Sequence, residues 1–277
     1  MSDRTIDVDT RTQRIKEFFD EDSVRYLDQR YPAEPRTCDQ LSYIVRRRHV
    51  LDMLDRAGSG GRLIDIGCGP AVLTPELVRR GWRVAAVDLS TGMLGAAHGA
   101  AAALPPGSVR FAAAQATRLP FRDGTFDVAL CIGVVSYVDD VPALLEGVRR
   151  VLRPGGEAIF QISNAIGMFE IEGRVIETVR KIVPSRHRDS HDRFRAEVKL
   201  HPYRPGLFDR WCREAGLERR EFRFFDFRPP QVIQRLAPAL SLRAGQALDA
   251  FGRSSVTTGL AASYLVRVAT AGKTGTR

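Results

Sequence analysis

The sequence predicts an α/β protein with a mostly parallel sheet that helices cover on both faces. Between residues 62 and 162, short apolar runs alternate with longer amphipathic runs, which is the pattern of strands and helices in turn. The chain has 277 residues, of which 44% are apolar. This length and composition suit one large domain with a buried core.

Two helices are predicted ahead of the alternating region. Residues 11–31 have an amphipathic pattern that ends at Pro32 and Pro35, because proline cannot continue a helix. Residues 39–57 form a second helical run, which stops at a glycine-rich turn. We expect residues 1–57 to form a helical cap.

The alternating region predicts five strands and the helices that connect them. The strands are expected at 62–66, 83–88, 109–112, 126–132 and 157–162, and the helices at 71–80, 90–103 and 141–152. Right-handed crossovers bring the carboxyl ends of parallel strands to one edge of the sheet, where open α/β sheets bind ligands. Functional residues are therefore expected just after Ile66, Val87, Ala112 and Ile132.

The alternation lapses after Asn164 and resumes forty residues later. Residues 165–183 predict a helix, and a polar segment rich in Arg and His follows, so we expect an inserted lid at about 165–204. Further elements are predicted as helix 205–215, strand 217–227, a helical stretch over 230–251 and strand 262–268. The main domain would then span 58–270, with a tail at 271–277.

A glycine turn follows the first predicted strand. Gly67-Cys68-Gly69 lets the backbone turn tightly and approach a ligand, and a helix beginning near Pro70 points its amides at the same place. A dinucleotide site would have glycine at position 72, where this chain has Val72. Asp65, two residues before the turn, would pair with a cationic group and repel a pyrophosphate.

A second carboxylate, Asp88, closes the next predicted strand. A carboxylate at this place accepts hydrogen bonds from ribose hydroxyls. Alternatively it caps the helix that follows Ser90, and both roles can coexist. A glycine turn with two carboxylates describes a ligand with a ribose and a positive charge but no phosphate. S-adenosylmethionine has those parts.

Four segments resemble the motifs of class I S-adenosylmethionine-dependent methyltransferases, most closely the UbiE/Coq5-like small-molecule enzymes. The segments are 63–70 (LIDIGCGP), 84–90 (VAAVDLS), 119–128 (LPFRDGTFDV) and 148–156 (VRRVLRPGG). The resemblance implies a Rossmann-like fold with a seven-stranded sheet. It also implies S-adenosylmethionine as cofactor and S-adenosylhomocysteine as product.

The resemblance implies a role for each matching position. Gly67 and Gly69 would lie against the methionine part of the cofactor, and Asp65 would hold its amino group. Asp88 would bind the ribose. The remaining candidates would contact the adenine or line the site: Leu89, Gln115, Ala116, Cys68 and Ile132. Relatives usually have Asp where this chain has Gln115, whose carbonyl can still accept from the adenine amino group.

The loop after the fourth strand, residues 133–138, faces the acceptor in this family. Tyr137 stands where many relatives have His. Tyrosine is a poor base at neutral pH, with a reference pKa of about 10, so it would orient the acceptor or simply pack. His191 and His201 lie in the predicted insertion and are candidate general bases. No metal site is expected at the His187 and His191 pair.

The partner is expected to be a small organic acceptor, anionic or lipid-like, methylated at oxygen. The net charge of +9 favours anionic partners, but the basic residues are scattered, so nucleic acid is not expected. The polar N-terminus and the absence of a long apolar run predict a cytoplasmic chain without a membrane span. A homodimer is left open.

Two alternatives and one surface remain open. The charge prompts an RNA methyltransferase, and Tyr137 and Gln115 leave room for a cofactor-binding protein that does not methylate, such as a cyclase. Residues 231–251 alternate apolar clusters with arginines. They would form a wall of the pocket or, less favoured, a surface that meets a membrane or a lipidic substrate.

Overall fold

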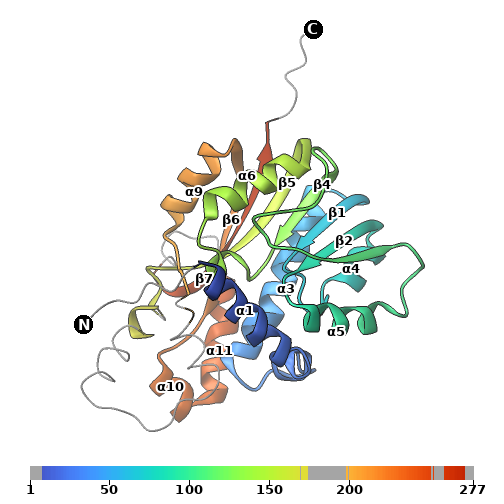
Figure 1. The fold of residues 1–277 in the computed structure, drawn as a ribbon. Coiled ribbons are helices and arrows are strands. Elements are labelled where there is room, and N and C mark those ends of the chain that lie inside the picture. The colour runs from blue at the N-terminus through green and yellow to red at the C-terminus, as the bar shows by residue number, and fades with distance from the viewer. Residues whose placement is uncertain are drawn as a thin grey trace.

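The computed structural model describes residues 8–168, 170–173, 198, 200–250, 252 and 259–271. Within these residues, seven strands form one sheet in the order β3-β2-β1-β4-β5-β7-β6 (Figure 1). The strands are β1 (Gly61–Ile66), β2 (Trp82–Asp88), β3 (Val109–Ala113), β4 (Phe126–Cys131), β5 (Leu152–Ser163), β6 (Leu217–Phe227) and β7 (Ala261–Thr270).

Strands β1 to β5 pair in parallel, and β7 runs antiparallel between β5 and β6. The predicted mostly parallel, seven-stranded Rossmann-like sheet is confirmed. Each parallel strand ends at the same edge, so Ile66, Asp88 and Cys131 come together there. We call this edge the carboxyl edge.

Helices cover both faces of the sheet. Helix α3 contributes Leu54 and other side chains to a core cluster on one face, together with Leu77 of α4. Helix α6 contributes Leu144 to the cluster on the other face, together with Phe208 of α9. The helices are α1 (Val8–Asp22), α2 (Tyr26–Arg30), α3 (Cys38–Ala57), α4 (Thr74–Arg79), α5 (Thr91–Ala101), η1 (Val135–Tyr137), α6 (Val141–Val151), α9 (Pro205–Glu214), α10 (Gln231–Leu236) and α11 (Pro238–Asp249).

Two long helical predictions were wrong in detail. The run at 11–31 forms two helices, α1 and α2, because the Ser23 hydroxyl bonds to the Asp20 carbonyl and the chain turns there. The run at 230–251 is likewise divided into α10 and α11. Pro238 takes the first position of α11, where its missing amide costs nothing.

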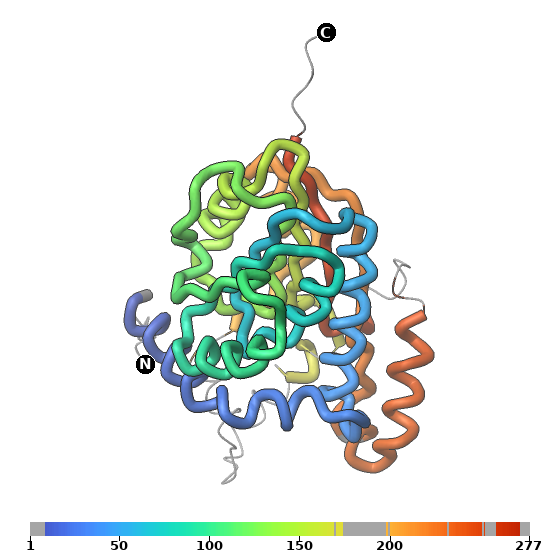
Figure 2. Tube along the Cα trace, turned by 90° about the vertical axis from the view of Figure 1, so that its right-hand side faces the viewer, coloured from blue at the N-terminus to red at the C-terminus, as the bar shows by residue number. Residues whose placement is uncertain are grey.

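The helices that precede β1 and those that follow β6 pack on the sheet, on one another and on a connecting helix. Helix α3 packs on β5 and β6, and α11 runs beside α3 (Figure 2). Helix α1 lies against α5, next to the carboxyl edge. None of the described helices is both long enough and apolar enough to cross a membrane.

Candidate functional site

The glycine turn is held against the neighbouring strand β2 and the loop that follows β4. The amides of Gly67 and Cys68 both donate to the Val87 carbonyl of β2, at 2.7 and 3.0 Å. Gly67 has φ of +69°, and a Cβ there would lie 2.1 Å from Cγ2 of Val134. Position 67 therefore requires glycine for both its backbone angle and the close approach of the next loop.

Asp88 joins the turn to the helix after β2. Its Oδ2 accepts the Gly69 amide and its Oδ1 accepts the Ser90 amide, both at 2.8 Å. Burial raises the pKa of Asp88 despite these bonds. A carboxylate has about four acceptor positions, so both oxygens can accept further hydroxyl donors. The expectation that Asp88 caps the next helix was wrong, because Ser90 is the cap of α5 and its hydroxyl accepts the Met93 amide at 3.0 Å. A ligand role for Asp88 is compatible with its two backbone bonds.

Asp65 is a buried carboxylate that faces a small cavity. Its exposed fraction is only 3%, and none of the described residues donates a hydrogen bond to its side chain. Burial, with the negative charge of Asp88 adding to it, raises the pKa of Asp65 to about 7. A carboxylate in this position has a strong requirement for a cationic partner.

The cavity beside Asp65 has a volume of about 50 Å³. The turn residues and Ile132 form one side of it, and residues from α2, α3 and the segment between them form the other. The lining residues are Tyr26, Tyr31, Arg46, Arg47, Val50, Asp65, Gly67, Cys68, Gly69, Pro70, Val72, Leu73 and Ile132.

Two arginines in this lining were missed by the sequence analysis. Nε of Arg47 is buried and has no hydrogen-bond partner among the described residues, while its Nη2 lies 3.2 Å from Glu76. Arg46 donates to the Tyr31 hydroxyl at 2.8 Å and to Gln161 at 3.3 Å. The available signal was the run of three arginines in the helix that precedes the glycine turn.

The predicted adenine residues lie beyond the carboxyl ends of β2 and β3. The half-buried Gln115 begins a turn in which its carbonyl accepts the Arg118 amide at 3.0 Å. Ala116 packs against the core cluster of the α6 face. Leu89 packs with Phe19 of α1 in a small separate cluster. The structure thus places these predicted residues at the same edge as the turn and Asp88.

Helix α1 is fastened over this edge through Asp20. Its Oδ1 accepts the Ser90 hydroxyl at 2.6 Å and the Gly92 amide at 2.9 Å, at the start of α5. Although partial burial opposes the shift, bonds from Lys16, Ser90 and Gly92 lower the pKa of Asp20 to about 2. The cap therefore closes beside Asp88 and Leu89.

Tyr137, a predicted catalytic candidate, packs under the cap. Its ring meets Phe19 edge to face, with ring centroids 5.4 Å apart, in a cluster that includes Ile15 and Leu89. This environment favours the packing role among the two considered. In the same loop, the Ser136 hydroxyl bonds to that of Ser163 at 3.0 Å.

His201 is the candidate base that the structure places at the acceptor loop. Its amide donates to the Ser136 carbonyl at 3.0 Å, and its Nε2 lies 3.3 Å from Oδ1 of Asp139. Arg11 of α1 also pairs with Asp139, at 3.0 Å. The other candidate base, His191, lies outside the described residues, as does His187. Within the described ranges, no group of three or more His, Cys, Asp or Glu residues has a metal-binding arrangement.

Comparison with known proteins identifies the family. A "Methyltransferase domain" family model matches residues 64–160. A ubiquinone biosynthesis O-methyltransferase of Aromatoleum aromaticum is 31% identical over 197 residues, which are 67% of this chain and 77% of that protein. The chain belongs to the class I S-adenosylmethionine-dependent methyltransferases.

Other relatives agree with this assignment. A demethylmenaquinone methyltransferase of Mycobacterium marinum is 41% identical over 105 residues, or 38% of this chain and 42% of that protein. The fold matches magnesium protoporphyrin IX methyltransferase of Synechocystis PCC 6803, solved with bound SAH, with a TM-score of 0.65 and 13% identity. The match covers 94% of this chain and 100% of that one. The present chain therefore uses S-adenosylmethionine as its cofactor. Its relatives do not favour the two alternatives, an RNA methyltransferase or a cyclase.

Proposed function

We propose that this methyltransferase O-methylates a small organic acceptor and binds the amino-acid end of S-adenosylmethionine between Asp65 and Arg47. The observation that supports the proposal is that one cavity holds two buried polar groups without hydrogen-bond partners among the described residues. The buried carboxylate of Asp65 has no donor among the described residues, and the buried Nε of Arg47 has no acceptor. An ammonium and a carboxylate on one ligand carbon would satisfy both groups.

The remaining cofactor contacts follow the carboxyl edge away from the cavity. Asp88 would accept the ribose hydroxyls with the lone pairs that Gly69 and Ser90 leave open. The adenine would lie near Leu89, Gln115 and Ala116. The turn residues Gly67, Cys68 and Gly69, with Ile132, would line the methionine part. When bound, the cofactor supplies an electrophilic methyl group on a sulfonium.

His201 is proposed to take the proton from the acceptor hydroxyl. Asp139 lies 3.3 Å from its Nε2 and would orient the ring, as carboxylates do for histidine bases. The deprotonated acceptor oxygen would then be able to take the methyl group that bound S-adenosylmethionine supplies, which would leave S-adenosylhomocysteine. Tyr137 would contribute a wall. His191 stays a second candidate base outside the described residues.

The acceptor is proposed to be a phenol or catechol, with a lipid-like tail or an acidic group. The names of two relatives, a ubiquinone biosynthesis O-methyltransferase and a demethylmenaquinone methyltransferase, support a quinone-related acceptor. The predicted insertion holds nine Lys and Arg against four Asp and Glu over 174–204, which supports an acidic acceptor.

Several broader predictions stay proposals. They are the cap at 1–57, the domain at 58–270 with a lid at about 165–204, the tail at 271–277, a cytoplasmic location and a homodimer. Limited proteolysis, cell fractionation and light scattering would test them in turn.

Labelled methyl transfer tests the proposed reaction. The enzyme is incubated with methyl-labelled S-adenosylmethionine and a panel of catechols, anilines and carbanion-forming quinols. Mass spectrometry then locates the label. Label on a catechol oxygen supports the proposal, whereas label only on nitrogen or carbon contradicts it.

A further inference from the structure

Helices α10 and α11 present large apolar side chains to solvent. Ile233, Leu236 and Leu240 are 45%, 81% and 63% exposed, and Pro238 and Ala239 between them are exposed as well. We call these five residues the α10–α11 patch. Isolated exposed leucines are ordinary, but several gathered within eight residues mark an interaction surface.

The charge around the patch is positive. Arg235 and Arg243 are exposed, and neither forms an ion pair with any described residue. No Asp or Glu occurs between residues 229 and 248. Apolar side chains flanked by arginines without ion-pair partners are complementary to a lipid bilayer whose interior is apolar and whose headgroups are anionic.

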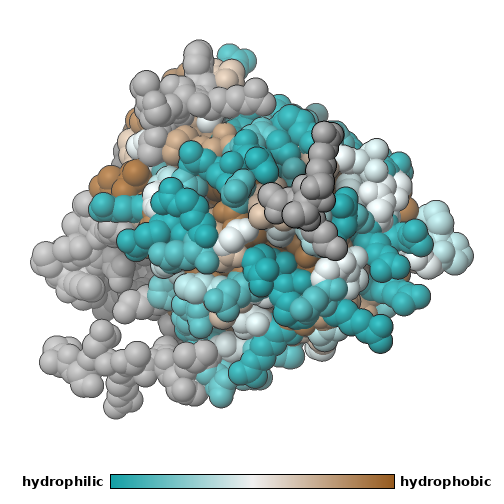
Figure 3. Space-filling view, turned by 90° about the horizontal axis from the view of Figure 1, so that it is seen from above, coloured by the Kyte–Doolittle hydropathy of each residue, from teal (hydrophilic) through white to brown (hydrophobic). Residues whose placement is uncertain are grey.

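The patch lies at the carboxyl edge. Strand β6 runs parallel to β5, so its last residue, Phe227, ends at this edge, and α10 begins four residues later. The amide of Gln231 donates to Glu172 in the start of the predicted insertion, at 2.7 Å. By contrast, hydrophilic residues dominate the opposite edge, where β7 ends (Figure 3).

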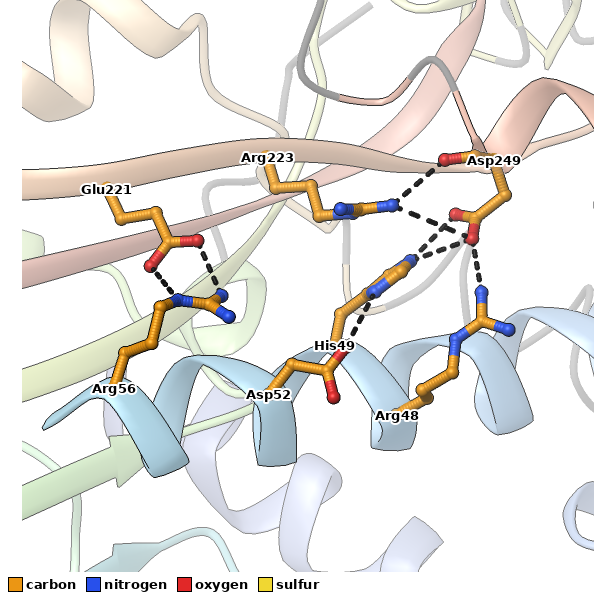
Figure 4. A network of polar contacts seen from close by, with 7 residues as sticks. All are labelled: Arg48, His49, Asp52, Arg56, Glu221, Arg223 and Asp249. Carbon is orange, nitrogen blue, oxygen red and sulfur yellow. Dashed lines mark hydrogen bonds and ion pairs between the residues drawn. The ribbon is translucent and has the colours of Figure 1, made fainter. Parts of the chain in front are cut away.

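A network of polar contacts holds the end of α11, at Asp249, against α3 and β6 (Figure 4). The carboxylate of Asp249 is bound by Arg48 and by Nε2 of His49, at 2.8 Å for the histidine. Arg223 of β6 donates to the Asp249 carbonyl at 3.0 Å. On the same helix, a Cβ at Gly245 would lie 2.9 Å from the Phe227 carbonyl, so α11 packs closely on the sheet.

We propose that the α10–α11 patch docks this enzyme on an anionic lipid bilayer, with Leu236 and Leu240 inserted at the interface and Arg235 and Arg243 at the headgroups. Because the contacts of Asp249 fix α11 to α3 and β6, a docked patch would hold the rest of the molecule in one orientation relative to the bilayer. The carboxyl edge, and with it the active site, would then lie near the membrane surface. The docking does not depend on which acceptor is methylated.

Vesicle co-sedimentation of the full chain tests the docking. We expect binding to vesicles with one third phosphatidylglycerol, weak binding to pure phosphatidylcholine, and at least tenfold loss between 0.05 and 0.5 M salt because charges are screened. Leu236→Gln/Leu240→Gln should lower the fraction bound at least tenfold. Arg235→Gln/Arg243→Gln should remove the preference for phosphatidylglycerol.

Two control variants separate the patch from general effects. Arg62→Gln/Arg83→Gln removes the same charge where β1 and β2 begin, at the opposite edge. Val24→Gln removes an equally exposed apolar side chain, 84% exposed, outside the patch. Both should bind vesicles like the wild type. Calorimetry with S-adenosylhomocysteine shows that each variant is folded.

Three results would overturn the docking. The first is no sedimentation of the folded wild type with anionic vesicles. The second is unchanged sedimentation of Leu236→Gln/Leu240→Gln. The third is a wild-type dimer that this double variant converts to monomers without any vesicle binding, which would assign the patch to a second copy of the chain.

Discussion

The carboxylate of Asp88 accepts the backbone amide of Gly69 at 2.8 Å, and this bond ties the end of β2 to the turn after β1. Asp88→Asn keeps the size of the side chain but loses the charge and one acceptor. It should weaken S-adenosylhomocysteine binding at least tenfold, or about 1.4 kcal/mol, by calorimetry. Asp127→Asn is the matched control, since Asp127 accepts the Arg62 amide away from the turn. Equal affinities for wild type and Asp88→Asn would refute the ribose assignment.

The raised pKa of Asp65 predicts how cofactor affinity depends on pH. Its pKa of about 7 means that the side chain must lose its proton before it can pair with an ammonium. Affinity for S-adenosylhomocysteine should therefore fall by about tenfold per pH unit below 7 and level off above it. Calorimetry at pH 5.5 to 8.5 measures this slope, and a flat profile would be inconsistent with the assignment.

The same residue predicts an opposite effect on the free enzyme. A carboxyl whose pKa is raised by folding stabilises the fold below its unfolded pKa, and this stability is lost as the pH rises through 7. Without ligand, Asp65→Asn should melt at a higher temperature than wild type at pH 8. The difference should shrink toward pH 4. A lower melting temperature for the variant at pH 8 would contradict the burial argument.

Two glycines of one turn should respond differently to alanine. Both have positive φ, but only at Gly67 does an added Cβ meet Val134, at 2.1 Å, whereas Gly69 has open space. Gly69→Ala should cost about 1 to 2 kcal/mol of unfolding free energy from the backbone alone. Gly67→Ala should cost more, and Val134→Ala should restore part of the loss. Denaturant titration decides, and equal costs would count against the contact.

Two glycines of α5 should respond differently to substitution by alanine, because only one of them lies against α1. An added Cβ at Gly92 would lie 2.9 Å from the Asp20 backbone, while Gly95 has open space. Gly92→Ala should displace α1, expose it to protease and weaken S-adenosylhomocysteine binding severalfold. Gly95→Ala should instead raise stability by about 0.5 to 1 kcal/mol, because alanine favours helix. A protease-resistant Gly92→Ala enzyme with normal affinity would show that α1 is not needed for closure.

The proposed role of His201 predicts an acidic limb in the pH–rate profile. If its imidazole takes the acceptor proton, kcat should rise with pH as the imidazole loses its own proton and becomes able to act as a base. His201→Asn should lower kcat by about a hundredfold and remove that limb, with little change in S-adenosylhomocysteine affinity. Asp139→Asn should have a smaller effect of the same kind. A retained limb in His201→Asn would exclude His201 as the base.

The sequence predicted the sheet, and the positions of the candidate cofactor residues along it, because both depend on local patterns. A buried parallel strand is a continuous apolar run, and the turn at Gly67 follows it directly. Asp65 and Asp88 could be named as candidates because the alternation of strands and helices fixes their places near the ends of two strands. Packing was also one of the two roles that the sequence suggested for Tyr137.

The arginine side of the cavity could not be predicted in the same way. Arg47 is twenty residues from Gly67 in the chain, and only the packing of α3 on the sheet brings them to one cavity. Likewise, the pairing of Arg11, Asp139 and His201 joins three distant segments. Helix breaks at Ser23 and Pro238 were missed because a continuous apolar periodicity masks a local turn.

The proposed binding of the amino-acid end is tested most directly by comparing two ligands. S-adenosylhomocysteine carries the ammonium and carboxylate, and 5′-methylthioadenosine lacks both. Calorimetry should show wild type preferring the first by at least about a hundredfold, with Asp65→Asn and Arg47→Met each losing most of that preference. Equal affinity of the wild type for the two ligands would contradict the placement of the amino-acid end between Asp65 and Arg47.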